Sequence, residues 1–268
     1  MNAVRIGIAG CSGRMGQMLV REVLATEGAV LAGGSERADS AAVGNDLGTL
    51  AGGAALGAVV HGDPKALFAA ADVVIDFTAP AASVAHANLA AETRRALVIG
   101  TTGLSDADRE APARAAQGAA IVLAPNMSLG INLLLALVEQ VAARLPGFDV
   151  EVLELHHKHK VDAPSGTALA LGDAAARGRH ARLSEVAVRT RDGHTGARPA
   201  GAIGFAALRG GAAVGDHTVM FLGEAERIEL THRAESRRIY AQGAVRAALW
   251  LKDRKPGLYG MKDVLGLG

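Results

Sequence analysis

Short apolar segments alternate with longer alanine-rich segments through the first half of the chain, and this alternation constrains the fold most strongly. Apolar strands that alternate with helical periods indicate a parallel sheet with crossover helices. The strand candidates are unbroken apolar runs such as VVIDF and LVIG, which is typical of strands covered by helices on both faces. We expect strands at 4–8, 30–33, 58–61, 73–77, 97–100 and 121–124, and helices at 14–25, 81–93, 106–117 and 129–145.

The pattern changes after about Phe148. A strand (DVEVLEL) and a helix (GTALALGDAAARG) are followed by four strand-like segments in succession, at 186–190, 203–208, 216–221 and 227–233. Strands without intervening helices indicate a mixed or antiparallel sheet. A final helical period at 237–251 has an apolar stripe that must be buried, so we expect it to pack back on the first domain. The predicted fold class is therefore α/β, with a parallel sheet in one domain and a second domain that begins near Met127.

Composition and charge narrow the possible partners. The 268 residues include 28 basic and 27 acidic side chains without a long run of one sign, so nothing indicates nucleic acid or an anionic membrane. The single cysteine, Cys11, allows no intramolecular disulfide and favours a reducing compartment, so we expect a cytoplasmic protein. The uncharged segment 115–138 is long enough to span a bilayer, but Pro125 and several polar residues interrupt it. We therefore expect a strand, a turn and a helix there, and no membrane span.

Three glycines, Gly10, Gly13 and Gly16, follow the first predicted strand and precede an amphipathic helix. Their spacing is a variant of the dinucleotide-binding fingerprint, in which glycines allow a tight turn, close approach of a pyrophosphate and close packing of helix on strand. Backbone N–H groups at the helix start would hold the anion. The alternative is that glycine only forms a turn in a chain with 34 glycines. The strand and helix on either side favour dinucleotide binding, and no Gly-Lys-Ser/Thr follows to indicate a Walker-type phosphate loop.

An acidic and a basic residue end the second predicted strand. Glu36 lies twenty positions after Gly16, where it would accept hydrogen bonds from the adenine ribose hydroxyls. Arg37 could pair with a 2′-phosphate, so both NADH and NADPH are possible cofactors. The alternative for both residues is an ordinary solvated pair at a strand end. We interpret Cys11, within the glycine turn, as a tolerated small residue and not as a reactive thiol.

Three later strand ends have similar turn sequences: DFTAP, GTTG and APNMS. In an open parallel sheet ligands bind outside the carboxyl ends of the strands, so Thr78, Thr101 and Thr102 are expected at one edge. Asn126 and Ser128 could instead, or also, cap the helix that begins at Leu129.

The segment ELHHKHKVDAPSGTA, residues 154–168, concentrates polar chemistry in an otherwise alanine-rich chain. On a strand, His157 and His159 would share one face and His156 the other, so at most two histidines would converge. No cysteine lies nearby and no H-E-x-x-H spacing occurs. We therefore predict no metal site.

The same segment ends in Asp-Ala-Pro-Ser-Gly-Thr, which is typical of a helix start. Free N–H groups at this helix start, the Thr167 hydroxyl and nearby Lys160 would bind a carboxylate. A histidine and a lysine beside that carboxylate can donate protons close to neutral pH. Reduction by hydride leaves an anion that must be protonated, so the sequence predicts an oxidoreductase with a separate substrate domain and a small acidic substrate.

The motifs together resemble the 4-hydroxy-tetrahydrodipicolinate reductases (dihydrodipicolinate reductases) of the bacterial diaminopimelate and lysine pathway. They occur in the family's order across nearly the whole chain: GIAGCSGRMG, DFTAP, GTTG, APNMSLGIN, ELHHKHKVDAPSGTAL, RDGHTGAR, IGFAALRGG and GDHTVMF. The histidine-lysine-PSGT segment is highly specific, whereas the glycine motif alone would be weak.

The resemblance implies a role for particular residues and a fold. Cofactor binding would involve Gly10, Cys11, Ser12, Gly13, Arg14 and Met15 at the pyrophosphate, Glu36 and Arg37 at the ribose, and Gly100, Thr101, Thr102, Ala124, Pro125, Asn126 and Met127 at the nicotinamide. His156 would donate or accept a proton, Lys160 would donate one, and His157, Gly166 and Thr167 would bind the dicarboxylate. The implied fold is a discontinuous Rossmann-like doubly wound domain (1–127 and 237–268) with a central α+β substrate-binding and oligomerisation domain (128–236) that forms a homotetramer. Met127 stands where an aromatic is expected, and Cys11-Ser12 replace commoner small residues.

The resemblance also implies the reaction: reduction of the hydroxylated tetrahydropyridine dicarboxylate by NADH or NADPH, with loss of water. Two other functions stay open, another two-domain NAD(P)-dependent amino-acid dehydrogenase and a protein that senses NAD(P) without chemistry. The choice of His156 or Lys160 as proton donor is open. A structural role is as probable as substrate contact for six further residues: His194, Arg198, Asp162, Arg209, Asp216 and His217. His159 could do no more than orient its neighbours.

Overall fold

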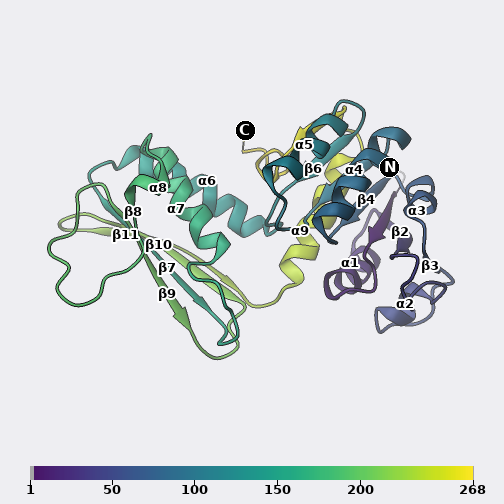
Figure 1. The fold of residues 1–268 in the computed structure, drawn as a ribbon, viewed down its shortest axis with the longest axis horizontal. Helices are drawn as coiled ribbons and strands as arrows, with labels where there is room; N and C mark the ends of the chain where they lie inside the picture. Colours follow the sequence, from purple (N-terminus) through teal and green to yellow (C-terminus); the bar gives the residue numbers. More distant parts are fainter. Residues whose placement is uncertain (1–2, 268) are drawn as a thin grey trace. The chain divides into compact units, whose positions relative to one another are not determined.

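The structure is a computed structural model that describes residues 3–267. The chain divides into two compact units, Met1–Leu129 with Arg238–Gly268, and Gly130–Arg237. The sequence-based boundaries lie two residues and one residue earlier, at 127/128 and 236/237. The first unit is built from both ends of the chain, purple and yellow in Figure 1.

The first unit contains a seven-stranded sheet in which every neighbouring pair is parallel. Its strand order is β12-β6-β5-β4-β1-β2-β3. The strands that follow β1 in sequence therefore lie on both sides of it, so the strand order reverses at β1. In open parallel sheets, ligands bind outside the carboxyl ends of the strands at such a switch point. The strands are β1 Val4–Ala9, β2 Ala29–Ser35, β3 Val60–His61, β4 Val73–Asp76, β5 Ala96–Ile99, β6 Ala120–Leu123 and β12 Gly257–Tyr259.

Helices cover both faces of this sheet. Alternate residues of a strand point to opposite faces, so Val73 and Ile75 belong to one hydrophobic core and Val74 to the other. The first core includes side chains of α1 and α9, and the second includes those of α3, α4 and α5. This two-sided burial explains the unbroken apolar runs of the sequence. The helices of the unit are α1 Arg14–Ala25, α2 Leu47–Leu50, α3 Pro64–Ala70, α4 Pro80–Thr93, α5 Asp106–Ala115, α9 Arg238–Leu251 and α10 Met261–Leu265.

The second unit contains a five-stranded mixed sheet of order β11-β10-β7-β9-β8. Strands β7, β9 and β8 pair in parallel, whereas β10 is antiparallel to β7 and β11. Helices α6 and α7 lie on one face (Figure 1), where Val150, Val152 and Phe221 are fully or almost fully buried. The elements are β7 Asp149–His156, β8 Ala187–Val188, β9 Ile203–Arg209, β10 Gly215–Leu222, β11 Arg227–Ala234, α6 Leu129–Arg144, α7 Gly166–Gly178 and α8 Leu183–Val186. The predicted fold class is confirmed.

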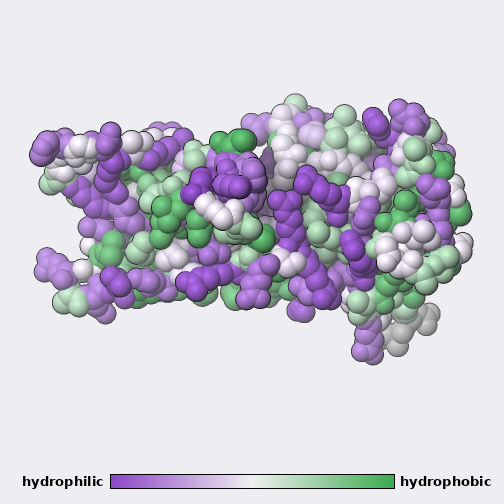
Figure 2. Space-filling model, turned by 90° about the horizontal axis from the view of Figure 1, so that it is seen from below, coloured by the Kyte–Doolittle hydropathy of each residue, from purple (hydrophilic) through white to green (hydrophobic). Residues whose placement is uncertain are grey.

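Several segments differ from the prediction, among them the short helices α2, α3 and α8, which were not expected. The strand expected at 186–190 is reduced to Ala187–Val188, and the tail after Pro256 contains a seventh strand, β12, that pairs with β6. Segment 115–138 forms a strand, a turn and the first part of α6, as expected. Within residues 3–267 no helix has the length and apolar character needed to cross a bilayer. Figure 2 shows hydrophilic and hydrophobic side chains interspersed over the side that it draws.

Candidate active site

The glycine turn joins the carboxyl end of β1, the strand at the switch point, to α1. Gly10 has φ +71°, a conformation that favours glycine, and a Cβ on Gly16 would lie 2.1 Å from the Gly10 carbonyl oxygen. Helix α1 therefore approaches the turn more closely than any side chain at position 16 would allow. Gly13 is the exposed N-cap residue and has no side chain to bond the first N–H groups of the helix. These N–H groups and the helix dipole suit an anion.

Glu36 is tied to this turn. Its Oε1 accepts hydrogen bonds from the Ser12 backbone N–H at 2.9 Å and the Ser12 hydroxyl at 2.7 Å. Arg37 is exposed, and its guanidinium lies 3.6 Å from the Asp39 carboxylate. The acidic side chain is thus held at the end of β2, while the basic one is exposed to solvent.

A cavity of about 810 Å³ opens beside the turn and is lined by residues that include Gly10, Gly13, Glu36, Arg37 and Thr78. Pockets for cofactors and other small molecules are usually about 300–1,000 Å³. The glycine turn, the carboxylate of Glu36 and the cavity together fit the phosphates and a ribose of a dinucleotide.

A buried polar network borders the cavity. Its centre is Asp76, which was not among the predicted site residues. Asp76, fully buried at the end of β4, accepts hydrogen bonds from Thr78 N–H and Oγ1 (2.9 and 2.6 Å) and Thr101 Oγ1 (3.2 Å). His86 Nδ1 lies 3.0 Å from the second Asp76 oxygen. Burial opposes ionisation, but the hydrogen bonds from His86 and Thr78 hold the pKa of Asp76 below its usual value. This carboxylate fixes the turns after β4 and β5.

The other predicted cofactor residues follow β5 and β6. Thr102 and Pro125 are exposed, and the Asn126 side chain accepts a hydrogen bond from Ser128 N–H at 2.9 Å. Cys11 and Met127 are each 1% exposed and belong to the hydrophobic core. Burial, followed by the charge of Glu36, raises the pKa of the Cys11 thiol to about 12. Only the backbone of Cys11 and Met127 is therefore available to a bound cofactor.

In the second unit, the segment of residues 154–168 leaves the sheet after His156, its first histidine. Strand β7 ends at His156, and residues 157–160 form a turn in which Lys160 N–H donates to the His157 carbonyl at 3.1 Å. The expectation that His157 and His159 share a strand face is wrong, because the ladder between β7 and β9 ends at the pair His156 and Arg209. His159 is exposed, and its ring centroid lies 6.3 Å from that of His157.

Helix α7 begins beside this turn. Ser165 is its N-cap, and the Ser165 hydroxyl accepts a hydrogen bond from Ala168 N–H at 3.1 Å. Gly166 is exposed, and a Cβ there would meet nothing within 4 Å. Thr167 is half-buried. The first N–H groups of a helix have no partner within the helix, so this start can accept an anionic group.

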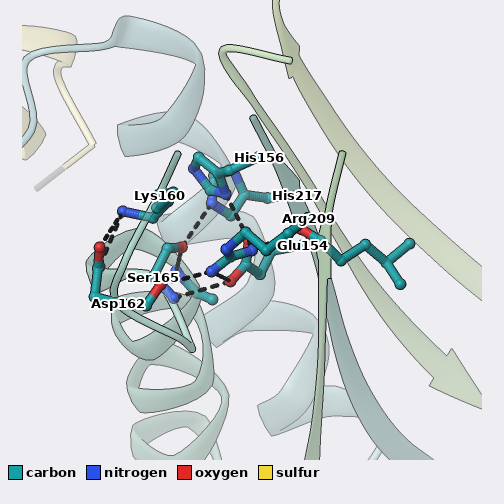
Figure 3. Close-up of polar contacts among 9 residues, drawn as sticks. Glu154, His156, Lys160, Asp162, Ser165, Arg209 and His217 are labelled. Atoms are coloured by element: carbon teal, nitrogen blue, oxygen red, sulfur yellow. Dashed lines mark hydrogen bonds and ion pairs between the residues drawn. The ribbon is translucent and has the colours of Figure 1, made fainter. Parts of the chain in front are cut away.

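Figure 3 shows the side chains gathered at this point: His156 and Lys160 lie near the start of α7, and Glu154, Arg209 and His217 lie beside them. Lys160 Nζ contacts both carboxylate oxygens of Asp162, at 2.8 and 2.9 Å. Desolvation, followed by the nearby positive charges of Arg237, His159 and His156, lowers the pKa of His157. The arrangement can bind a carboxylate and supply a proton.

Comparison with known proteins decides the family. A family profile described as "Dihydrodipicolinate reductase, N-terminus" matches residues 4–127, and one described as "Dihydrodipicolinate reductase, C-terminus" matches residues 130–265. The chain belongs to the dihydrodipicolinate reductase family. The resemblance noted in the sequence is confirmed.

Named relatives of this family match over their full length. The 4-hydroxy-tetrahydrodipicolinate reductase of Rhizobium rhizogenes is 56% identical over 99% of this chain and 98% of its own. That of Brucella abortus is 55% identical over 97% of this chain and 98% of its own. The structure of dipicolinate-bound dihydrodipicolinate reductase from Paenisporosarcina sp. TG-14 has a TM-score of 0.76 and 25% identity, and covers 96% of this chain and 97% of its own.

Three residues of the second unit were not among the predicted site residues of this dihydrodipicolinate reductase family member: Glu154, Arg209 and His217. Glu154 is 1% exposed and bonds His156, Ser165 and Arg209. His217 is 4% exposed, and its Nε2 lies 3.1 Å from the Ser165 hydroxyl. Burial, followed by the charge of His156, lowers the pKa of His217 to about 4. One signal was available: Glu154 occupies the buried register of β7, two residues from His156 and on the same face.

The described residues, 3–267, contain no group of three or more His, Cys, Asp or Glu side chains arranged to hold a metal ion. The histidines instead contact Glu154, Ser165 and one another.

Proposed function

We propose that this chain reduces 4-hydroxy-tetrahydrodipicolinate to tetrahydrodipicolinate with loss of water, using NADH or NADPH, in bacterial diaminopimelate and lysine biosynthesis. The names of its full-length relatives support this reaction. The observation that carries the proposal is the position of a buried histidine, His156, near the open start of helix α7 (Figure 3). A proton donor beside an anion-binding helix start is what reduction of a cyclic imine dicarboxylate needs.

The first unit binds the cofactor in this proposal. The turn from Gly10 to Met15 holds the pyrophosphate, and Glu36 and Arg37 hold the adenosine ribose. Backbone and side chains at the ends of β5 and β6 contact the nicotinamide half: Gly100, Thr101, Thr102, Ala124, Pro125, Asn126 and Met127. When bound, the nicotinamide supplies the hydride. Glu36 suits the free ribose hydroxyls of NADH and Arg37 suits the 2′-phosphate of NADPH, so the chain has a group for each.

The second unit binds the substrate. Gly166 and Thr167 present N–H groups at the positive end of α7 to one carboxylate, and His157 binds the dicarboxylate beside them. The relative from Paenisporosarcina sp. TG-14 was solved with dipicolinate, a planar dicarboxylate, which supports this substrate class. Binding at two carboxylates would fix the orientation of the ring and lower the entropic cost of reaction.

Proton supply is the task of His156 or Lys160. Hydride addition to the ring carbon leaves an electron pair on the conjugated nitrogen system, and a proton from one of these side chains neutralises it. Each has an adjacent carboxylate, Glu154 for His156 and Asp162 for Lys160.

We further propose a homotetramer assembled through the second unit. The sheet face opposite α6 and α7 presents Leu153, Leu155, Thr218 and Met220, all partly exposed, and Leu208, which is 50% exposed. A sheet face with apolar residues at its centre suits contact with another copy. A pathway that consumes NADH or NADPH also agrees with the cytoplasmic location that we expect from the single cysteine.

The test of the proposed function is substrate-dependent oxidation of NADH and NADPH by the purified protein. We expect turnover with 4-hydroxy-tetrahydrodipicolinate and competitive inhibition by dipicolinate. Turnover of a 2-oxo acid with ammonia would favour an amino-acid dehydrogenase. Cofactor binding without turnover of either substrate would favour a sensor.

A further inference from the structure

Glu154 is a charged residue on the buried face of β7. On β7 it follows Val150 and Val152 on the face that packs against α6 and α7, and it is 1% exposed. Burying an ionised carboxylate is costly unless hydrogen bonds and opposite charges compensate for the lost hydration. Glu154 therefore needs partners, and their identity indicates its role.

Four hydrogen bonds saturate this carboxylate (Figure 3). Oε2 lies 2.5 Å from His156 Nδ1 and accepts from Arg209 Nη1 at 2.8 Å. Oε1 accepts from Arg209 Nη2 at 2.8 Å and from the Ser165 N–H at 3.1 Å. Desolvation opposes ionisation, but the bonds from Arg209, His156 and Ser165 hold the pKa of Glu154 below its usual value. The side chain is thus an anion that joins the proton-handling histidine to the helix start.

The bond to Nδ1 determines which atom of His156 can react. A carboxylate acceptor fixes the proton on Nδ1, so Nε2 is the ring atom left to exchange a proton with another group. Nε2 faces Gly215, where a Cβ would lie 2.8 Å away. A side chain at position 215 would therefore clash with the imidazole ring, and glycine there allows β10 to pack closely against Nε2.

Arg209 partly neutralises the negative charge of Glu154. Its guanidinium makes a bidentate pair with the carboxylate, and its Nη2 also donates to the Asp162 carbonyl oxygen at 2.6 Å. The same arginine therefore holds the loop that contains Lys160. Because Arg209 offsets the negative charge, His156 feels a carboxylate that is partly neutralised.

We propose that Glu154 is a positioning residue of the reaction: with Arg209 it holds His156 in the Nδ1–H tautomer and aligns it with the carboxylate-binding start of α7. This inference rests on the proposed function, because it assigns His156 to proton transfer.

Other charged and titratable groups face His156 from each surrounding element. The His217 ring on β10 packs edge-on at 5.1 Å between centroids, with His232 of β11 acting on His217. In the turn after β7 lie His157, whose pKa is lowered by desolvation and nearby positive charges, and Lys160, which pairs with Asp162. Glu154 is the closest negative group among the contacts described, so its removal should change the protonation of His156 most.

The test compares the pH dependence of kcat/KM in wild type, Glu154→Gln and Arg209→Gln. Loss of the carboxylate disfavours the imidazolium, so the alkaline limb of the profile should move to lower pH by about one pH unit or more in Glu154→Gln. Loss of the arginine leaves the carboxylate uncompensated, so the limb should move to higher pH in Arg209→Gln. We expect kcat to fall about 10- to 100-fold in Glu154→Gln, within the usual range for proton transfer, with an unchanged KM for NADH.

Glu151→Gln is the matched control, since Glu151 lies on the same strand but pairs with Arg191 and Arg198. Its profile should match that of wild type. Nitrogen NMR of His156 supplies a readout independent of turnover: Nδ1 should be protonated in neutral wild type, and the tautomers should mix in Glu154→Gln.

An unchanged limb and unchanged tautomer in Glu154→Gln would overturn the inference. If that variant does not fold, a limb in Arg209→Gln that is unmoved or moves to lower pH would overturn it equally. Wild type without turnover would contradict the proposed function instead, and the NMR tautomer would still decide whether Glu154 orients His156.

Discussion

The carboxylate of Glu36 accepts both hydrogen bonds that Ser12 can donate, from its backbone N–H at 2.9 Å and from its hydroxyl at 2.7 Å. The end of β2 is therefore joined to the glycine turn after β1. Neutralising Glu36 weakens both this link and the proposed bonds to the ribose hydroxyls.

We expect Glu36→Gln to raise the KM for NADH about tenfold, because a hydrogen bond to a charged group contributes roughly 1.5–3 kcal/mol and 1.4 kcal/mol corresponds to a factor of ten. Steady-state kinetics with varied NADH measure the effect. The exposed Glu27→Gln serves as control and should leave the KM unchanged. Equal KM values in the two variants would remove Glu36 from the cofactor site.

Arg37→Ala separates the two cofactors. Arg37 is exposed and its pair with Asp39 is long, at 3.6 Å, so it is free to meet a 2′-phosphate. We expect the KM for NADPH to rise about tenfold or more, because a charge-assisted bond contributes roughly 1.5–3 kcal/mol, while the KM for NADH changes less than about twofold. Arg109→Ala, on the exposed side of α5, is the control. A parallel rise for both cofactors would show that Arg37 does not read the 2′-phosphate.

Lys160→Ala should lower kcat by about 100-fold or more, the usual size of a general-acid contribution. The KM for NADH should change little, because Lys160 belongs to the second unit. Lys158→Ala is a matched control from the same turn, with an exposed side chain. A large loss of NADH affinity in Lys160→Ala would mean that this lysine belongs to the cofactor site.

His217 should make the free energy of unfolding decrease at acidic pH. Burial, followed by the charge of His156, lowers the pKa of His217 to about 4, whereas a histidine in an unfolded chain titrates near about 6.5. Between these values the unfolded chain binds a proton that the folded chain does not. The contribution of His217 to stability is therefore complete above about pH 6.5 and is lost as the pH falls toward 4.

Thermal melting of wild type and His217→Gln from pH 7 to pH 4 measures this effect. At about 1.4 kcal/mol per pKa unit, wild type should lose on the order of 3 kcal/mol over this range through His217, and the variant should lose less. His194→Gln, at an exposed position, should behave as wild type. Parallel pH dependence in wild type and His217→Gln would contradict the lowered pKa of His217.

Removal of metal ions should leave turnover unchanged. The histidines of residues 156–159 contact Glu154, Ala213, Lys160 and one another, and we assign no step to a metal. Dialysis against a strong chelator, followed by assay with and without added zinc, checks this expectation. Loss of activity that zinc restores would refute the assignment of proton transfer to side chains alone.

The sequence predicted those structural features that depend on interactions between neighbouring residues. The glycine turn, the strand ends and the start of α7 were readable because each depends on a few neighbouring residues, such as Gly10 before α1 or Ser165 before Gly166. The unbroken apolar strands also predicted helices on both faces of the first sheet.

Contacts between distant residues were not readable in the same way. Glu154 meets Arg209 across the pairing of β7 with β9, 55 positions apart, and β12 joins β6 across more than 130 positions. No periodicity specifies such a partner, because strand register depends on the tertiary packing of whole elements. The buried network around His156 was therefore found only from the structure. The sequence did contain one irregularity, a glutamate on the buried face of β7.

Deuterium transfer tests the central claim most directly. Wild type is incubated with 4-hydroxy-tetrahydrodipicolinate and NADH that is deuterated at the transferring position, and the product is analysed by mass spectrometry and NMR. The account predicts one deuterium on a ring carbon of tetrahydrodipicolinate for each NADH oxidised. Oxidation of NADH without deuterium in that product, or no oxidation at all, would contradict it.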